Sequence, residues 1–364
     1  MTPAQIRPLW PYLASTDKPI VLYGMGNGAD KILAVCERFG VAIADFFASD
    51  DFVRGHTFHG KRVLSYSEIR EKYGTGRFIV LLSFASFRPD VLANIQRIAA
   101  ETELYAPDVP VCGENLFDSA FAAAHAEEIA EARSLLADAA SQKVYDLLLC
   151  YKLSGQIRFL SEADSEPDEV YSPLLRAERF TRIADLGAYN GDTIRQIAAY
   201  APHLKDCYAM EPDGRNYRKL CEYRDSESRF AVHPFNTAAW SETATLSFSK
   251  EGNRNSGIGN VNAKTAKTVT VQADSLDNLL AQNGVEALDY IKFDIEGAER
   301  EAIFGCRATI AQCSPQLLIS AYHRSEDLFS LPLLVHRLFP DYKLYLRKFR
   351  YIPAWDVNLL AIKP

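Results

Sequence analysis

The sequence predicts two Rossmann-like α/β domains in tandem, joined by a helical segment. Apolar runs alternate with helix-period segments over the first ~110 residues, a stretch rich in Ala, Leu and Glu follows, and the alternation resumes near Phe180. A chain of 364 residues is long enough for two separate cores. We therefore expect an N-terminal domain over residues 1–115, a helical connector over 116–170 and a second domain over 171–364.

The N-terminal domain is expected to hold a parallel sheet covered by helices. Apolar runs of strand length occupy residues 19–24, 41–48 and 77–85. Helical periodicity marks residues 29–39 and 89–100, and the second of these segments opens with a proline, which is favoured at a first helical position. The connector lacks Gly and Pro over residues 118–153, which predicts two helices there.

The second domain repeats the alternation and closes with an antiparallel pair. Helical or helix-like connections separate the expected strands, and the last two strands are expected at the edge of the sheet. The predicted strands are 182–187, 206–211, 230–240, 288–294, 315–323, 342–349 and 356–363.

Composition and charge exclude several classes of protein. A net charge of −7 and a pI near 5.6 disfavour nucleic acid as a partner, because nucleic-acid binders need a basic face. The N-terminus lacks the apolar core of a signal peptide, and no later run reaches the ~18 apolar residues of a membrane span. Seven cysteines without a C-x-x-C pair do not suggest a disulfide framework. We expect a cytoplasmic protein.

The stretch "IADLGAYNGDT", residues 183–193, predicts a ligand-binding turn after a buried strand. Gly187 and Gly191 let the backbone approach a ligand, and the helix beginning near Asp192 and Thr193 offers unpaired N–H groups. Asp185 can accept a hydrogen bond from a ligand amine or hold the loop. No lysine stands where a phosphate loop would need one, so a zwitterionic ligand fits better than a polyphosphate.

An acid after the next strand completes this pattern. Glu211 can chelate both hydroxyls of a ribose, and with Pro212 beside it the pattern favours S-adenosylmethionine over a dinucleotide. The structural alternative is a tight turn with a helix-capping acid. Asn236, with Ala238 and the alanine after it, is placed to contact the adenine edge.

The C-terminal half, from Tyr171 to Lys363, resembles the FkbM-type methyltransferases. The resemblance rests on "ADLGAYNGDT", "EPDGRNYRKL", "NTAAW", "ISAYHRSEDLF" and above all "KFDIEGAE" within "DYIKFDIEGAEREAIFG". It implies a class I methyltransferase sheet with an antiparallel edge, S-adenosylmethionine as cofactor, and methyl transfer to a hydroxyl, often on a sugar or polyketide; we expect a sugar, glycan or nucleotide-sugar. The expected cofactor-binding residues are Asp185, Gly187, Ala188, Tyr189, Asn190, Gly191, Asp192, Thr193, Glu211, Pro212, Asn236, Ala238 and Asp294.

Asp294, Glu296 and His323 are the candidate catalytic residues. An alcohol attacks a sulfonium methyl more easily when a base or a metal removes its proton. We expect a metal-free mechanism with His323 or Asp294 as the base, and His323 is expected to project into the same cleft as Asp294. The alternative is a divalent ion held by Asp294, Glu296 and His323. Glu299 reads as a helix cap.

The N-terminal domain carries a dinucleotide-like motif, G-x-G-x-x-A, at Gly24, Gly26 and Ala29, with Asp45 or Asp50 as the ribose acid. This segment also resembles the nucleotide-sugar-associated Rossmann-like domain of glycan-modifying enzymes. An NAD(P)-dependent sugar-modifying enzyme and a non-catalytic nucleotide- or glycan-binding protein therefore stay open as alternatives.

Two further segments are candidates for acceptor contacts. The polar loop "EGNRNSGIGN", residues 251–260, either grips substrate or is a hairpin tip. The cations Arg324, Arg347, Lys348 and Arg350, interleaved with aromatic residues, either bind an anionic glycan or protect an edge strand. The expected partner is a small-molecule or glycan acceptor, and a homo-oligomer is compatible with the sequence.

Overall fold

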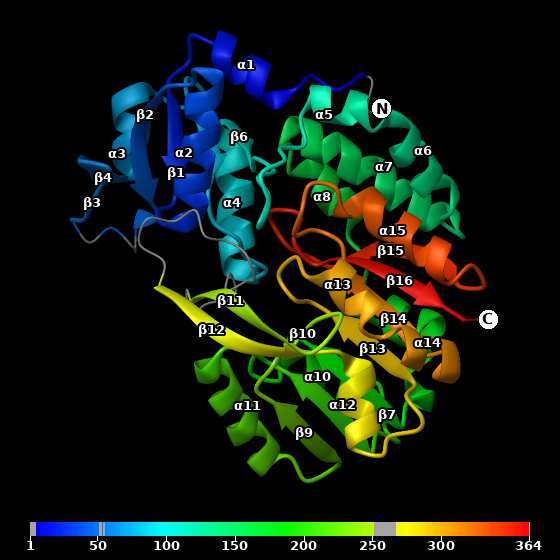
Figure 1. The fold of residues 1–364 in the computed structure, drawn as a ribbon. Coiled ribbons are helices and arrows are strands. Elements are labelled where there is room, and N and C mark those ends of the chain that lie inside the picture. Colours follow the sequence, from blue (N-terminus) through cyan, green and yellow to red (C-terminus); the bar gives the residue numbers. More distant parts are fainter. Residues whose placement is uncertain (1–4, 51–52, 54, 251–266, 364) are drawn as a thin grey trace.

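The computed structural model describes residues 5–50, 53, 55–250 and 267–363 (Figure 1). The polar loop expected at 251–260 therefore lies outside the described residues. Two large sheets organise the rest, and we call them the N-terminal sheet and the C-terminal sheet. Figure 1 shows the N-terminal sheet in blue and cyan, with the green connector helices near the red C-terminal strands.

The N-terminal sheet has the strand order β3-β4-β2-β1-β5-β6 and is parallel except for the β3–β4 hairpin. The strands expected at 19–24, 41–48 and 77–85 are confirmed as β1, β2 and β5. The strands are β1 Ile20–Tyr23, β2 Ile43–Ala48, β3 Thr57–Phe58, β4 Lys61–Ser65, β5 Ile79–Leu82 and β6 Glu103–Tyr105, and the helices are α1 Leu9–Ser15, α2 Asn27–Phe39, α3 Tyr66–Tyr73 and α4 Pro89–Glu101.

The prediction of two connector helices was wrong, because the segment breaks into more pieces. The chain leaves the helix at His125 and again after Ser134, and the Asp138 side chain then caps a new helix by accepting from the Ser141 N–H at 2.7 Å. The helices are α5 Ser119–Ala124, α6 Ala126–Ser134, α7 Ala139–Ser154, α8 Arg158–Ala163 and α9 Pro167–Glu169.

The C-terminal sheet has the strand order β15-β16-β14-β13-β7-β8-β9. Strand β16 runs antiparallel to both of its neighbours, as expected for the closing pair, while β14, β13, β7, β8 and β9 pair in parallel. Its strands are β7 Arg182–Leu186, β8 Asp206–Met210, β9 Ala231–Phe235, β13 Tyr290–Phe293, β14 Gln316–Ser320, β15 Lys343–Lys348 and β16 Val357–Ile362.

The single strand expected over 230–240 is two strands in different sheets. After β9, the chain forms β10 in a small sheet of order β10-β12-β11. This sheet contains β10 Ala238–Ala239, β11 Ala244–Lys250 and β12 Lys267–Asp274. The helices of this half are α10 Asp192–Ala198, α11 Gly214–Ser226, α12 Leu276–Gln282, α13 Glu299–Phe304, α14 Arg307–Cys313 and α15 Asp327–Leu338, with two short helical turns at Val170–Leu174 and Ala177–Arg179.

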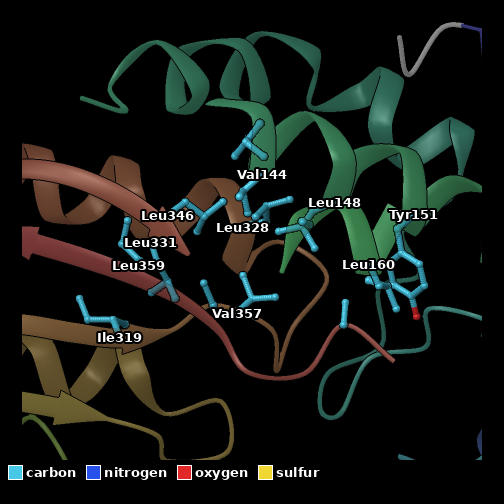
Figure 2. Packing of buried hydrophobic residues seen from close by; sticks show 14 of the residues in the cluster. Val144, Leu148, Tyr151, Leu160, Ile319, Leu328, Leu331, Leu346, Val357 and Leu359 are labelled. Atoms are coloured by element: carbon cyan, nitrogen blue, oxygen red, sulfur yellow. The ribbon is translucent and has the colours of Figure 1, made fainter. Parts of the chain in front are cut away.

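Connector helices cover one end of the C-terminal sheet. Figure 2 shows Val144 and Leu148 of α7 and Leu328 of α15 directed toward strand residues such as Leu346 and Leu359, and all five are buried. Burial of such side chains supplies most of the favourable free energy of folding. The connector is therefore part of the core beneath β14–β16.

Two buried ion pairs join the connector to β15. The Arg347 guanidinium lies 2.6 Å from the Asp138 carboxylate, and Lys348 Nζ lies 2.6 Å from Asp164 Oδ1. Lys348 is fully buried. The interpretation of these two cations as a glycan-binding or edge-protecting surface was therefore wrong, because both are interior cations paired with connector acids.

Among the described residues, no helix has both the length and the apolar character that crossing a bilayer would require.

Candidate functional site

A cavity of about 640 Å³ opens at the carboxyl ends of the C-terminal sheet's parallel strands. Strand β7 pairs with β8 on one side and β13 on the other, so the strand order reverses at β7. Open α/β sheets bind ligands at such a switch point. Turns after β7, β8 and β13 all line the cavity, as the sequence pattern predicts.

The two glycines of the β7 turn are required by neighbouring protein atoms. Gly187 has φ +88°, and a Cβ there would lie 1.9 Å from the Asp294 carbonyl oxygen. Gly191 has φ +81°, and its Cβ would lie 2.4 Å from the Tyr223 ring. Close approach to a ligand was the expected reason for these glycines. The structure instead assigns both to close packing of the turn, although Gly187 also lines the cavity.

The β7 turn presents some of its expected cofactor-binding residues to the cavity and places others behind it. Gly187, Tyr189, Asp192 and Thr193 line the cavity, whereas Asp185, Ala188, Asn190 and Gly191 do not. The buried Asp185 accepts a hydrogen bond from Thr193 Oγ1 at 2.5 Å and therefore holds the start of α10. Burial raises the pKa of Asp185.

Two oxygen atoms behind this turn are buried without a hydrogen-bond partner. Among the described residues, neither Asp185 Oδ1 nor Asn190 Oδ1 has one, although Lys292 Nζ lies 3.9 Å from the former. Buried polar atoms are usually satisfied in native proteins. Unpaired acceptors at this position are compatible with a ligand that brings donors.

Glu211 lines the cavity at the end of β8. Its Oε2 accepts from the Tyr189 N–H at 2.9 Å and its Oε1 accepts from the Asp213 N–H at 2.8 Å. Burial raises the pKa of Glu211 to about 7, although both backbone donors favour the anion. The carboxylate is thereby oriented by the backbone and keeps further lone pairs for a ligand.

Only some of the residues expected to contact the adenine edge line the cavity. Ala238 and Ala239 line the cavity, together with Pro212. Asn236 is exposed and lies outside the cavity wall, and its amide donates to the carbonyl oxygens of Glu211 and Pro212 at 2.9 and 3.1 Å. Asn236 therefore supports the Glu211 turn from behind.

Asp294 lies in the cavity wall between a lysine and a tyrosine. Lys292 Nζ is 3.0 Å from Asp294 Oδ2, and the Tyr322 hydroxyl donates to Asp294 Oδ1 at 3.0 Å. Burial alone would raise the pKa of Asp294, but Lys292 and His323 outweigh it and lower the pKa to about 2. Asp294 is therefore a permanent anion and a weak base.

Lys292 and Tyr322 also line the cavity, and the sequence analysis assigned neither a role. The position of Lys292 in the cavity wall could have been predicted from the sequence. It stands two positions before Asp294 near the end of one strand, and residues two apart share a face.

His323 is fully buried behind the cavity and is absent from its wall. The expectation that it projects into the cleft was wrong: side chains alternate along an extended chain, and Tyr322 takes the cavity side. His323 Nε2 lies 3.5 Å from Asp294 Oδ1 and 3.6 Å from Glu296 Oε2. Its Nδ1 lies 2.9 Å from Glu299 Oε1 without hydrogen-bond geometry.

His323 and Glu296 differ in pKa and in access to the cavity. Burial lowers the pKa of His323, but Glu299 and Glu296 outweigh it and raise the pKa to about 10, so the imidazole is cationic at neutral pH. Burial raises the pKa of Glu296 to about 8, and Glu296 lines the cavity with a left-handed backbone, φ +56°. Of the three candidate catalytic residues, Glu296 alone combines access to the cavity with a pKa near neutrality.

Two acids near His323 accept hydrogen bonds from backbone N–H groups. Glu299 accepts from the Ile295 and Gly297 N–H groups at 3.0 and 3.4 Å, so it holds the turn before α13 and does not cap the helix as expected, and Asp327 accepts from the Arg324 N–H at 2.7 Å. Within the described ranges, Glu299, His323 and Asp327 bring ligand atoms within 4.8 Å of one another. Their oxygens already serve the turns around the histidine, and binding of a divalent ion here, or at Asp294, Glu296 and His323, stays an alternative for experiment.

Segments that follow strands of the N-terminal sheet also contribute to the cavity wall, through Phe87 after β5, Pro89 at the start of α4 and Val111 after β6. Lys31 Nζ donates to the Val111 carbonyl oxygen at 2.5 Å, and the Cys112 N–H donates to the His323 carbonyl oxygen at 3.0 Å. Residues from both ends of the chain therefore enclose one site. Sequence reasoning missed this arrangement, because no local pattern encodes it.

The dinucleotide-like motif is packed against its own sheet. A Cβ at Gly24 would lie 2.7 Å from atoms of Ser83 and Phe84, so this glycine makes room for the end of β5. Asp45 pairs with Lys72 at 2.8 Å, and Asp50 accepts from Ser67 Oγ at 2.8 Å. Both candidate ribose acids thus already have protein partners.

Comparisons with known proteins agree with the C-terminal geometry. Residues 185–353 match the model of the methyltransferase FkbM domain. A solved structure of the FkbM methyltransferase from Methylobacillus flagellatus KT aligns over 94% of this chain and 90% of its own, with 20% identity and a TM-score of 0.67, which shows a shared fold. No curated protein matched the chain.

Two more distant structures were also found. An rRNA methylase from Streptococcus thermophilus has 11% identity, a TM-score of 0.34 and coverage of 52% of this chain and 92% of its own. The fibrillarin pre-rRNA processing protein of Methanococcus jannaschii has 16% identity, a TM-score of 0.34 and coverage of 51% and 68%. Within the C-terminal half, residues 185–353 are therefore similar to the methyltransferase FkbM domain.

Proposed function

We propose that this chain transfers the methyl group of S-adenosylmethionine to a hydroxyl group of an acceptor. The observation that carries the proposal is the position of Glu211 and of Asp294 with Glu296 in the wall of one cavity. A volume of about 640 Å³ falls within the roughly 300–1,000 Å³ of small-molecule sites.

The residues present fit this cofactor. Glu211 is oriented by two backbone donors and keeps lone pairs for the ribose hydroxyls. Gly187, Tyr189, Asp192 and Thr193 of the β7 turn line the same cavity and are the residues placed to contact the amino acid end. When bound, S-adenosylmethionine supplies an electrophilic methyl group on a sulfonium.

Glu296 acts as the general base. It lines the cavity beside Asp294, and its pKa of about 8 is suited to accepting a proton near neutral pH. Glu296 would take the proton of the acceptor's O–H, and the bound sulfonium would supply the methyl carbon for the acceptor oxygen. His323, held cationic behind both carboxylates, is a positioning residue. This assigns the base to Glu296, in place of His323 or Asp294.

Calorimetry on the full chain tests cofactor choice. We expect binding of S-adenosylmethionine and S-adenosylhomocysteine and none of NAD⁺ or NADP⁺. Binding of a nicotinamide nucleotide alone would support the alternative of an NAD(P)-dependent sugar-modifying enzyme. Binding of S-adenosylmethionine without transfer of a labelled methyl group to any hydroxylated acceptor would support a non-catalytic protein.

Chelation tests the metal alternative. With Glu296 as a metal-free base, dialysis against EDTA leaves methyl transfer unchanged. Loss of transfer that Mg²⁺ restores would replace this mechanism with a divalent ion held by Asp294, Glu296 and His323.

A further inference from the structure

Four aromatic side chains form a row along the cavity wall, from its mouth to Asp294. Phe87, Tyr351, Trp355 and Tyr322 all line the cavity. Their ring centroids are separated in turn by 5.5, 5.8 and 6.4 Å. The last ring places its hydroxyl on Asp294 at 3.0 Å. We call these four residues the aromatic row.

The first ring, Phe87, comes from the loop between β5 and α4, and backbone hydrogen bonds hold this loop in place. The Ser86 N–H donates to the Ile352 carbonyl oxygen at 2.8 Å, and the Ile352 N–H donates to the Ser86 carbonyl oxygen at 3.0 Å. This isolated antiparallel bridge sets Phe87 beside Tyr351. The row is therefore a fixed arrangement built from both ends of the chain.

Phe87 is unusual in its exposure. Its exposed fraction is 52%, and among the described residues the only other large hydrophobic side chain marked as exposed is Met25, at 36%. Exposed aromatic surface at the mouth of a cavity is favourable to cover with a ligand. Phe87 thus has surface that a bound acceptor would bury.

Polar groups accompany the row. Glu166, Asp356 and Asn358 line the same cavity, and the Asn358 amide donates to Asp356 Oδ1 at 2.9 Å. Arg350, which lies 3.7 Å from Glu166, also lines the cavity, so the wall beside the aromatic row carries both hydrogen-bond donors and acceptors. Sugar rings offer apolar C–H faces that stack on aromatic rings and hydroxyl edges that donate to carboxylates.

We infer that the aromatic row is an acceptor subsite for a chain of sugar rings, and that Phe87 extends it into the N-terminal sheet. This inference rests on the methyl transfer proposed above. The ring next to Asp294 and Glu296 presents the hydroxyl to be methylated, and a following ring stacks toward Phe87. The N-terminal sheet is thereby assigned a role in choosing the acceptor.

The test uses a printed array of defined oligosaccharides of increasing length, probed with the labelled full chain in the presence of S-adenosylhomocysteine. We expect longer oligosaccharides to be retained better than their monosaccharides. Phe87→Ala should weaken binding about tenfold, as expected for loss of one stacked ring, and Phe87→Tyr should restore it. Met25→Ala is the matched control, because it removes the other exposed side chain away from the cavity.

Two results would overturn the inference: no oligosaccharide retained by a chain that binds S-adenosylhomocysteine, or equal binding by Phe87→Ala and Met25→Ala. Failure of the proposed function would be seen in a different experiment. If the chain binds neither S-adenosylmethionine nor S-adenosylhomocysteine in calorimetry, the cofactor assignment is wrong, whatever the array shows.

Discussion

The carbonyl oxygen of Asp294 occupies the space that a side chain at Gly187 would need, only 1.9 Å from the ideal Cβ position. The turn that ends β7 and the turn that ends β13 therefore touch through backbone alone. One turn carries expected cofactor contacts and the other carries the candidate catalytic acids, so this contact limits the distance between them.

Gly187→Ala tests that contact. The new methyl group would overlap the Asp294 backbone, and the residue would keep a left-handed φ of +88°. We expect the free energy of unfolding to fall by about 1–3 kcal/mol and S-adenosylmethionine affinity to fall about tenfold or more, measured by urea unfolding and calorimetry. Gly284→Ala is the control, since its φ is +66° but nothing lies within 4 Å of its Cβ. Unchanged affinity in Gly187→Ala would contradict the prediction.

Glu296→Gln tests the general base. In the native chain, kcat/KM should rise with pH through a pKa near 8, because the carboxylate must be deprotonated to accept the proton. The glutamine variant should lose about 10²-fold in kcat and lose this rising limb. Glu301→Gln, outside the cavity wall, should behave like the native chain. An unaltered pH profile in Glu296→Gln would remove Glu296 from the mechanism.

Glu211 predicts a pH dependence of cofactor binding. Its pKa is raised to about 7, so lowering the pH from about 8 to about 6 protonates it and removes an acceptor for a ribose hydroxyl. We expect S-adenosylmethionine affinity to fall roughly tenfold over this range, and Glu211→Gln to bind weakly at every pH. Calorimetry at several pH values measures both. Glu222→Gln, on the exposed side of α11, should keep the native dependence.

Removing either partner of the Lys348–Asp164 ion pair should lower the free energy of unfolding by different amounts. Asp164→Ala leaves a fully buried ammonium without its carboxylate, which should lower the free energy of unfolding by about 3–5 kcal/mol. Lys348→Met replaces the cation with an apolar side chain of similar length and should cost less. Urea unfolding of both variants gives the comparison, and equal losses would show that the charge is not the cause.

The sequence predicted the positions of the strands, the antiparallel closing pair and several residues that line the cavity. Apolar runs predicted the strands of the C-terminal sheet, and the acids following β8 and β13 were expected to lie in one place because the carboxyl ends of parallel strands share an edge. Structure confirms that Glu211 and Asp294 line the same cavity. Motif spacing suffices for such residues, because each is tied to a strand end.

Other residues depend on contacts that no local pattern contains. His323 was expected in the cleft, but the alternation of side chains places Tyr322 there. Arg347 and Lys348 were interpreted as surface cations, because the sequence near them does not show that Asp138 and Asp164 of the connector are their partners. The bridge between Ser86 and Ile352 joins segments far apart in the sequence, so neither segment alone predicts the other.

The bridge between Ser86 and Ile352 brings the loop from Ser83 to Arg88 to the cavity wall, where Phe87 lies. This loop is far in sequence from Asp294 and Glu296. On the subsite inferred above, exchanging the loop is expected to change acceptor preference while the residues around Asp294 stay in place, so that acceptor selectivity can diverge without a change in the proposed methyl-transfer residues.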